Sequence, residues 1–117
     1  MFLDGLSVQK RAIAYYRHSA EDKQENSVPI QREHAEKFAL KHQIEIIHEE
    51  ADEGKTGLLA NRPGFESLFR DWILNLEAPP FDYVLVYDVS RWGRFQDQDE
   101  AAYYEFRCKK RGKKVIY

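Results

Sequence analysis

The chain has 117 residues, of which 43% are hydrophobic and 14% aromatic, so it can bury one core and is expected to form a single globular domain. Its net charge of −2, with 32% charged residues of both signs, excludes a disordered polyelectrolyte and a domain that holds nucleic acid by overall positive charge. A single cysteine excludes an internal disulfide, and the lack of a signal-like or roughly 20-residue apolar segment predicts a cytoplasmic protein without a membrane role.

The first half of the chain predicts a strand followed by a helix. Residues 1–10 show no sustained period and are expected to form a flexible N-terminal extension. The apolar run AIAYY at 12–16 predicts a buried strand, and the polar run after it predicts a loop. Apolar residues then recur at helical spacing after Ser27, the expected N-cap, which predicts a helix over about 28–42.

The middle of the chain repeats this order. A strand is expected at 44–48, and the polar, glycine-containing stretch 49–61 predicts a loop. Asn61 is the expected N-cap of the clearest helix, whose apolar residues keep the i, i+3, i+4 spacing as far as Leu76. The Ala-Pro-Pro turn at 78–80 is expected to end that helix.

The last third predicts strands at 82–88 and 114–117 with a helix near 98–110 between them. Alternating strands and helices favour a three-layer α/β/α fold with a mostly parallel sheet of four or five strands. Residues 11–117 therefore form one predicted domain. Because the final strand lacks a covering element, we expect this domain to be part of a longer protein.

Two of the predicted strands are followed by residues suited to phosphate binding. Arg17 and Ser19 follow the first strand, and Ser90, Arg91 and Arg94 follow the third. Reactive groups in an open parallel sheet gather beyond the carboxyl ends of the strands. If these two strands are neighbours, a serine hydroxyl faces three guanidinium groups, an arrangement that suits a phosphodiester without a metal. The same spacing also fits surface arginines and loop serines without a catalytic role.

Five short motifs occur in order along the chain from about residue 12 to its end. They are YxRxS at 15–19, SVPIQ at 27–31, DEGKTG at 52–57, NRPGF at 61–65 and SRWGR at 90–94. Together they resemble the catalytic domain of the serine recombinases of the resolvase/invertase family. The linked order of the motifs is much more specific than any one of them.

The resemblance implies a chemistry for the candidate residues. Ser19 would be the nucleophile that attacks a DNA phosphate and forms a covalent 5′-phosphoserine, while Arg17, Arg91 and Arg94 would bind that phosphate. Strand exchange and religation would follow without ATP, so no cofactor and no metal are expected. Family members act on DNA as dimers that assemble into tetramers, and a separate C-terminal region, absent here, reads the DNA sequence.

The resemblance also implies supporting residues around the site. Gln31 and Arg62 fall where the family has an active-site glutamine and a further arginine, and Tyr15 belongs to the first motif. Many members carry an aspartate directly before the first arginine of the loop after the third strand, where this chain has Ser90. Asp88, two residues earlier, is the candidate replacement for that carboxylate.

Other interpretations stay open from the sequence. The missing aspartate leaves room for a non-catalytic assembly module of the same fold. The acids Glu49, Glu50, Asp52 and Glu53 leave room for a metal-dependent phosphodiesterase, although a solvated loop explains them better. The basic segment 107–114 fits either a contact with a DNA backbone or a helix end whose cations favour the helix dipole.

Overall fold

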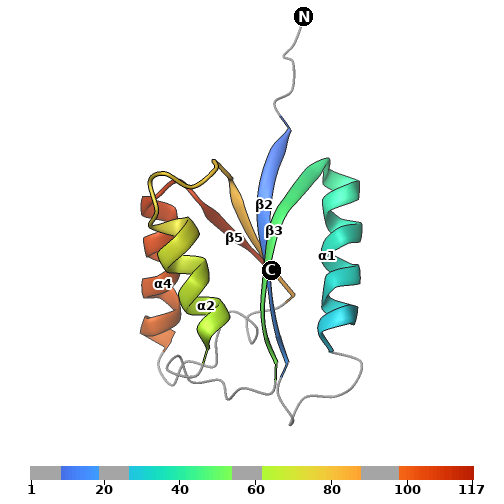
Figure 1. Ribbon diagram of the computed structural model, residues 1–117, viewed down its shortest axis with the longest axis horizontal. Helices are drawn as coiled ribbons and strands as arrows, with labels where there is room; N and C mark the ends of the chain where they lie inside the picture. The colour runs from blue at the N-terminus through green and yellow to red at the C-terminus, as the bar shows by residue number, and fades with distance from the viewer. Residues whose placement is uncertain (1–8, 19–26, 54–61, 88–97) are drawn as a thin grey trace, which may run out of the picture.

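A four-stranded parallel sheet lies between two layers of helices (Figure 1). The computed structural model describes residues 9–18, 27–53, 62–87 and 98–117. Its elements are strand β2 (Lys10–His18), helix α1 (Val28–His42), strand β3 (Ile44–Glu53), helix α2 (Pro63–Ser67), the π-helical turn η3 (Leu68–Ile73), strand β4 (Tyr83–Val86), helix α4 (Gln98–Lys110) and strand β5 (Lys114–Ile116).

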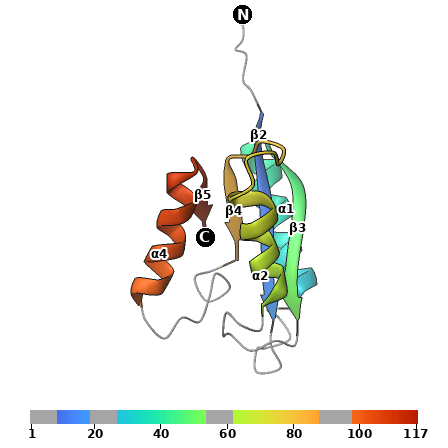
Figure 2. The ribbon, with the colours of Figure 1, turned by 60° about the vertical axis from the view of Figure 1, so that its left-hand side comes forward.

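The two faces of the sheet are covered by different helices. Helix α1 packs on β2 and β3, whereas α2 with η3 and α4 lies on the opposite face (Figures 1 and 2). Residues of β2 alternate between the two cores: Ala12, Ala14 and Tyr16 pack on the α1 side, and Ile13 and Tyr15 pack on the α2 side. The predicted three-layer α/β/α fold is therefore confirmed.

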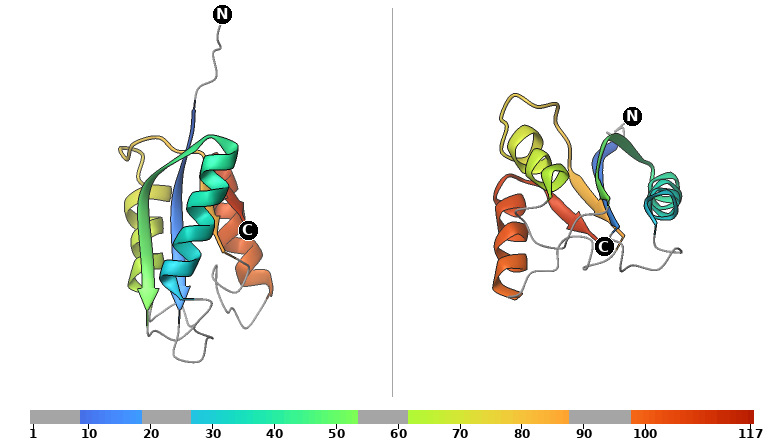
Figure 3. Two further views of the ribbon diagram at one scale, coloured as in Figure 1. Left: turned by 90° about the vertical axis from the view of Figure 1, so that its right-hand side faces the viewer. Right: turned by 60° about the horizontal axis from the view of Figure 1, so that its bottom comes forward.

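The strand order is β3-β2-β4-β5, so β2 and β4 are neighbours. They run parallel, with Tyr15 beside Val86, and both end at the same edge of the sheet (Figure 3). The chain winds from β2 to β3 on one side and then crosses back to β4 on the other, which makes this pair the switch point of the sheet. The expected adjacency of the first and third predicted strands is confirmed.

Strand β3 is longer than the sequence predicts. Residues 49–53 were expected to begin a loop, but β3 pairs with β2 as far as the His18 and Glu53 positions. Tyr16 of β2 donates a hydrogen bond from its hydroxyl to Glu49 at 2.8 Å. Tertiary pairing with a central strand thus overrides the low strand propensity of this acidic sequence.

A β-bulge in β3 changes which residues face α2. Ala12 pairs with Ile46, but the next residue of β2, Ile13, pairs with His48, so Ile47 is the extra residue. Ile46 packs in the α1 core, whereas Ile47 packs in the α2 core and His48 stacks on Trp72 of η3. Because of the bulge, the residues of β3 after Ile47 point to the opposite face of the sheet from the one that unbroken alternation along the strand would give them.

The helix that follows residue 62 ends earlier than predicted. Its regular part stops at Ile73, and Leu76 is 84% exposed instead of packing on the core. Asn75 makes the turn: its side-chain amide donates to the Asp71 carbonyl at 3.1 Å, and its Oδ1 accepts from the Glu77 N–H at 2.9 Å. The chain thus leaves the helix before it reaches the prolines.

The remaining elements agree with the predictions except at their ends. Ser27 occupies the N-cap position of α1 with an extended backbone, and β2 begins at Lys10, the last residue of the expected extension. The strand predicted at 82–88 is assigned only from Tyr83 to Val86. Within the described part of the chain, none of the helices is long and apolar enough to cross a membrane.

Candidate active site

Buried polar side chains gather at the carboxyl ends of β2 and β3. Each of them has at most 2% of its surface exposed. Buried charges and hydrogen-bonding groups are costly unless they find partners, so their contacts define how this part of the fold is held together. The residues are Tyr15, Arg17, Gln31, Asp52 and Arg62.

Asp52 joins β3 to β2 and to the start of helix α2. Its carboxylate accepts a hydrogen bond from the Tyr15 hydroxyl at 2.7 Å, from the Gly64 N–H at 2.8 Å and from the Phe65 N–H at 3.1 Å. The two amides belong to the first turn of α2, whose N–H groups lack partners within the helix. A negative charge there also favours the helix dipole. Asp52 therefore caps α2 from a neighbouring strand, whereas the expected cap, Asn61, lies outside the described residues.

Gly64 makes this cap possible by its lack of a side chain. A Cβ atom at this position would lie 2.9 Å from the Ala51 carbonyl oxygen and 3.0 and 3.1 Å from the two carboxylate oxygens of Asp52. Backbone atoms cannot yield as a flexible side chain does. Only glycine therefore lets the first turn of α2 approach β3 closely enough for both amides to reach the carboxylate.

Arg62 occupies the N-cap position of α2 and turns back into the cluster. Its Nε donates to the Tyr15 hydroxyl at 3.1 Å, and its guanidinium carbon lies 4.1 Å from the Phe65 ring centre and 5.3 Å from that of Tyr15. Burial raises the pKa of the Tyr15 phenol well above its usual range, partly offset by the charge of Arg62 and reinforced by Asp52. The phenol therefore stays neutral and donates a hydrogen bond to the Asp52 carboxylate.

Gln31 holds the end of β2 from the other face of the sheet. Its Nε2 donates to the Arg17 carbonyl oxygen at 2.8 Å, and its Oε1 accepts from the Arg17 N–H at 3.2 Å. Strand alternation places the Arg17 side chain on the face of Tyr15, and the β2 and β3 register sets it beside Asp52. A side-chain amide from α1 thus fixes the backbone of the arginine two residues before Ser19.

The structure brings together part of the predicted site. Tyr15, Arg17, Gln31 and Arg62 lie in one buried cluster at the expected edge of the sheet. The other predicted residues, Ser19, Asp88, Ser90, Arg91 and Arg94, lie outside the described residues.

Asp52 is the residue whose role the sequence analysis missed. It was assigned to a solvated acidic loop, which is wrong because its carboxylate is buried and accepts three hydrogen bonds. The available signal was the pair of motifs DEGKTG and NRPGF, which supply the carboxylate and the helix start that it caps.

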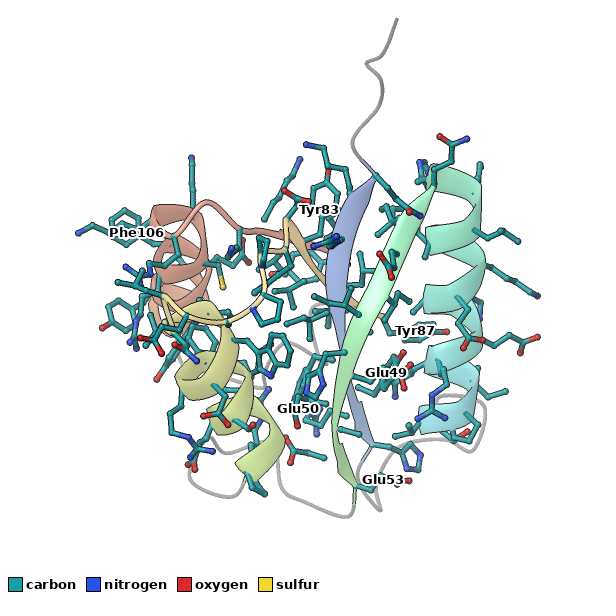
Figure 4. The ribbon with its side chains drawn as sticks, turned by 45° about the horizontal axis from the view of Figure 1, so that its top comes forward. Glu49, Glu50, Glu53, Tyr83, Tyr87 and Phe106 are labelled. Carbon is teal, nitrogen blue, oxygen red and sulfur yellow. The ribbon has the colours of Figure 1, made fainter. Side chains whose placement is uncertain are left out.

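The acids of β3 do not converge on a metal site. Glu49 points toward α1 and bonds Tyr16 and Arg32, whereas Glu50 points toward α2 and bonds His48 and Ser67 (Figure 4). Within the ranges that the structure describes, no three acidic, histidine or cysteine side chains are grouped to hold a metal ion. The hypothesis of a metal-dependent phosphodiesterase therefore has no support from these residues.

Comparison with known proteins identifies the family of this chain. The family model described as "Resolvase, N terminal domain" matches residues 12–117. The chain belongs to the resolvase N-terminal domain family. This resolvase-family chain is the catalytic domain of a site-specific serine recombinase. No match was found among the curated proteins.

Several solved structures share the fold of this resolvase-family domain. The N-terminal catalytic domain of TP901-1 integrase superposes with a TM-score of 0.75 at 26% identity, covering 92% of this chain and 75% of that one. The C-terminal catalytic domain of ISC1926 TnpA, an IS607-like serine recombinase, gives 0.73 at 24% identity, with 91% and 68% covered. A resolvase family site-specific recombinase from Streptococcus pneumoniae gives 0.72 at 22% identity, with 92% and 70% covered.

Proposed function

We propose that this domain cleaves and rejoins DNA by transesterification, with Ser19 as the nucleophile. The Ser19 oxygen forms a bond to phosphorus while the bond from phosphorus to the 3′ oxygen breaks, and the hydroxyl proton ends on the released 3′ hydroxyl. The product is a 5′-phosphoserine, whose bond energy allows religation to a new partner strand without ATP. The observation that carries the proposal is the adjacency of β2 and β4 at the switch point of the sheet.

Arginine charge supplies the electrostatic part of the proposed reaction. Arg17 lies at the carboxyl end of β2, and the segment that contains Arg91 and Arg94 follows β4, the adjacent strand. Fixed guanidinium groups neutralise the charge that spreads over the phosphate oxygens in phosphoryl transfer. Because the Arg17 side chain is fully buried, DNA reaches it only after groups that cover it move aside.

The other buried residues act in this proposal as positioning residues. Gln31 holds the backbone of Arg17 through two hydrogen bonds, so it orients the end of β2 without touching DNA. Tyr15 and Asp52 hold the start of α2, and Arg62 is fixed against them. These contacts limit how far the end of β2 shifts when DNA binds.

Asp88 and Ser90 directly precede the arginines Arg91 and Arg94 in the sequence, and we assign them different roles. A carboxylate near the arginines would orient them or accept a proton, and Asp88 is our candidate for it because Ser90 replaces the aspartate of many family members. Asp88→Asn should then slow cleavage, while Ser90→Ala should leave the cleavage rate nearly unchanged.

DNA is the proposed substrate, and self-association into dimers and tetramers is the proposed working state. A suicide DNA substrate that carries the recombination site of the intact protein tests the nucleophile. Ser19→Ala should abolish the covalent adduct and leave site binding nearly intact, whereas Ser27→Ala, a matched control at the start of α1, should retain the adduct. Adduct formation by the Ser19→Ala variant at the wild-type rate would overturn the proposal.

A further inference from the structure

Phe65, in the first turn of α2, presents its ring to the guanidinium group of Arg62. The guanidinium carbon lies 4.1 Å from the Phe65 ring centre, compared with 5.3 Å from that of Tyr15. Both members of the closer pair are buried, with 0% of Arg62 and 1% of Phe65 exposed. A cation–π contact is stronger when both groups are removed from water. The Phe65 ring therefore helps to determine where this guanidinium lies.

The start of α2 brings these two residues together. Arg62 is the N-cap residue and Phe65 is the third residue of the helix, and these two positions face each other across the first turn. The Phe65 N–H also donates a hydrogen bond to the Asp52 carboxylate at 3.1 Å. The cap that holds the first turn of α2 thus also fixes the backbone from which the Phe65 ring extends.

Three elements hold the Phe65 ring in place. Its centre lies 5.6 Å from the Tyr15 ring of β2, 5.0 Å from the Phe69 ring of η3 and 5.5 Å from the Tyr104 ring of α4. The Tyr15 and Tyr104 rings are in edge-to-face arrangements with it, which are attractive. The Phe65 ring therefore cannot turn without disturbing neighbours on a strand and on two other helical elements.

The hydrogen bond that Arg62 makes to Tyr15 does not by itself fix the plane of the guanidinium group. This bond joins Nε to the phenol oxygen at 3.1 Å, and it leaves rotation about that one contact open. The orientation of the plane matters, because a guanidinium group binds phosphate oxygens as a rigid planar fork. A ring face 4.1 Å away restricts this rotation. The hydrogen bond and the ring face together fix both the position and the plane.

We propose that Phe65 is a positioning residue of the active site, whose ring holds the plane of the Arg62 guanidinium group. The inference rests on the proposed function, in which the resemblance places Arg62 among the active-site residues. Phe65 is buried, so it acts through Arg62 and not by touching DNA. Tyr104 extends this support to α4, so a shift of α4 against α2 would loosen the ring and, with it, the arginine.

Single-turnover cleavage of a suicide substrate by the intact protein tests this role. Phe65→Leu keeps an apolar side chain but removes the ring face, and it should slow adduct formation by about ten-fold. Tyr104→Leu should slow it by about three-fold, because the ring loses one supporting contact. Phe81→Leu is the matched control, since Phe81 is a buried aromatic residue of the same core, and it should cleave at the wild-type rate.

Fluorinated phenylalanines separate the electrostatics of the ring from its packing. Fluorine atoms weaken the negative potential of the ring face and change the shape of the ring little. The rate of adduct formation should therefore fall stepwise as one, two and three fluorine atoms are placed on the ring of residue 65. The same series at Phe81, whose ring centre lies 4.2 Å from Lys113 Nζ, should leave the rate unchanged. A rate that does not respond to fluorination at Phe65 would overturn the proposal.

A double-mutant cycle shows whether Phe65 acts through Arg62. Arg62→Gln removes the cation, so adding Phe65→Leu to this variant should slow adduct formation by less than about two-fold more. A further ten-fold loss in the R62Q/F65L variant would contradict the proposed route, because the effect of Phe65 would then not depend on Arg62.

Nuclear magnetic resonance of the 117-residue chain tests the contact without any DNA cleavage. The Arg62 Nε–H resonance should carry the upfield shift that a nearby ring face causes. Phe65→Leu should remove this shift, whereas Phe81→Leu should retain it. A resonance that Phe65→Leu leaves in place would overturn the positioning role. If the wild-type protein formed no DNA adduct, the proposed reaction would fail, and this measurement would still decide whether Phe65 holds Arg62.

Discussion

The Tyr15 hydroxyl donates a 2.7 Å hydrogen bond to Asp52 across two neighbouring strands. The same carboxylate accepts hydrogen bonds from two backbone N–H groups in the first turn of α2. One buried charge therefore joins β2, β3 and that helix. Arg17 follows Tyr15 by two residues on the same strand face. The placement of the candidate catalytic arginine thus depends on a network that also stabilises the fold.

Replacement of Asp52 by asparagine should destabilise the domain by about 1–3 kcal/mol, since the buried cap loses its charge-assisted hydrogen bonds. Urea unfolding measures the change. The matched control is Glu53→Gln, an exposed acid on the same strand, which should shift the free energy of unfolding by less than about 0.5 kcal/mol. Equal stability of the two variants would contradict the capping role.

Gly64→Ala should destabilise the domain by about 1–3 kcal/mol, because the new Cβ overlaps the Ala51 carbonyl and the Asp52 carboxylate. The methyl group of Gly64→Ala and the charge lost in Asp52→Asn both weaken the contact between the Asp52 side chain and the first turn of α2. The double variant D52N/G64A should therefore cost less than the sum of the single changes in the free energy of unfolding. Additive effects would show that the close approach and the cap are independent.

Gln31→Met should slow formation of the covalent DNA adduct by about ten-fold or more, because the Arg17 backbone loses both hydrogen bonds from α1. Single-turnover cleavage of a suicide substrate gives the rate, and a DNA-binding titration gives the affinity, which should change little. Glu36→Met, at an exposed position of the same helix, is the control and should cleave at the wild-type rate. Equal rates for the two variants would contradict the positioning role.

Stability should fall as the pH rises above 10. Burial is the main cause that raises the pKa values of Tyr15 and Tyr16 above the ordinary 10.0, and hydrogen bonds to Asp52 and Glu49 reinforce it. Both phenols hold their protons more tightly in the folded state than in the unfolded state. Their contribution to the free energy of unfolding is therefore complete below pH 10 and is lost as the pH rises above it. The free energy of unfolding, measured between pH 8 and 11.5, tests this prediction. Tyr15→Phe should make that free energy fall less steeply with pH above pH 10.

Much of the fold could be predicted because the spacing of apolar residues that marks each strand or helix lies within that element and can be read from the sequence alone. AIAYY at 12–16 and the 3.6-residue period of α1 mark the central strand and its covering helix correctly. The strand order places Arg17 at the expected edge of the sheet. The hypothesis of a phosphate site placed the candidate residues at this edge, because they follow the first and third predicted strands.

The role of Asp52 could not be read from local sequence. The face of the sheet that it occupies depends on the bulge at Ile47, which is a property of the pairing between β2 and β3. The end of η3 likewise depends on the Asn75 turn, which competes with an apolar pattern that continues to Leu76. Both features arise from tertiary contacts that propensity and periodicity do not contain.

The central claim is that Ser19 becomes covalently joined to the 5′ end of cleaved DNA. Peptide mass spectrometry of the adduct, formed by the intact wild-type protein on a suicide substrate, locates the modified residue directly. The account predicts a phosphodeoxynucleotide on the peptide that contains Ser19, with a free 3′ hydroxyl on the released strand. A nucleotide attached to Ser90 or to any other residue, or a phosphate left on the 3′ end, would contradict it.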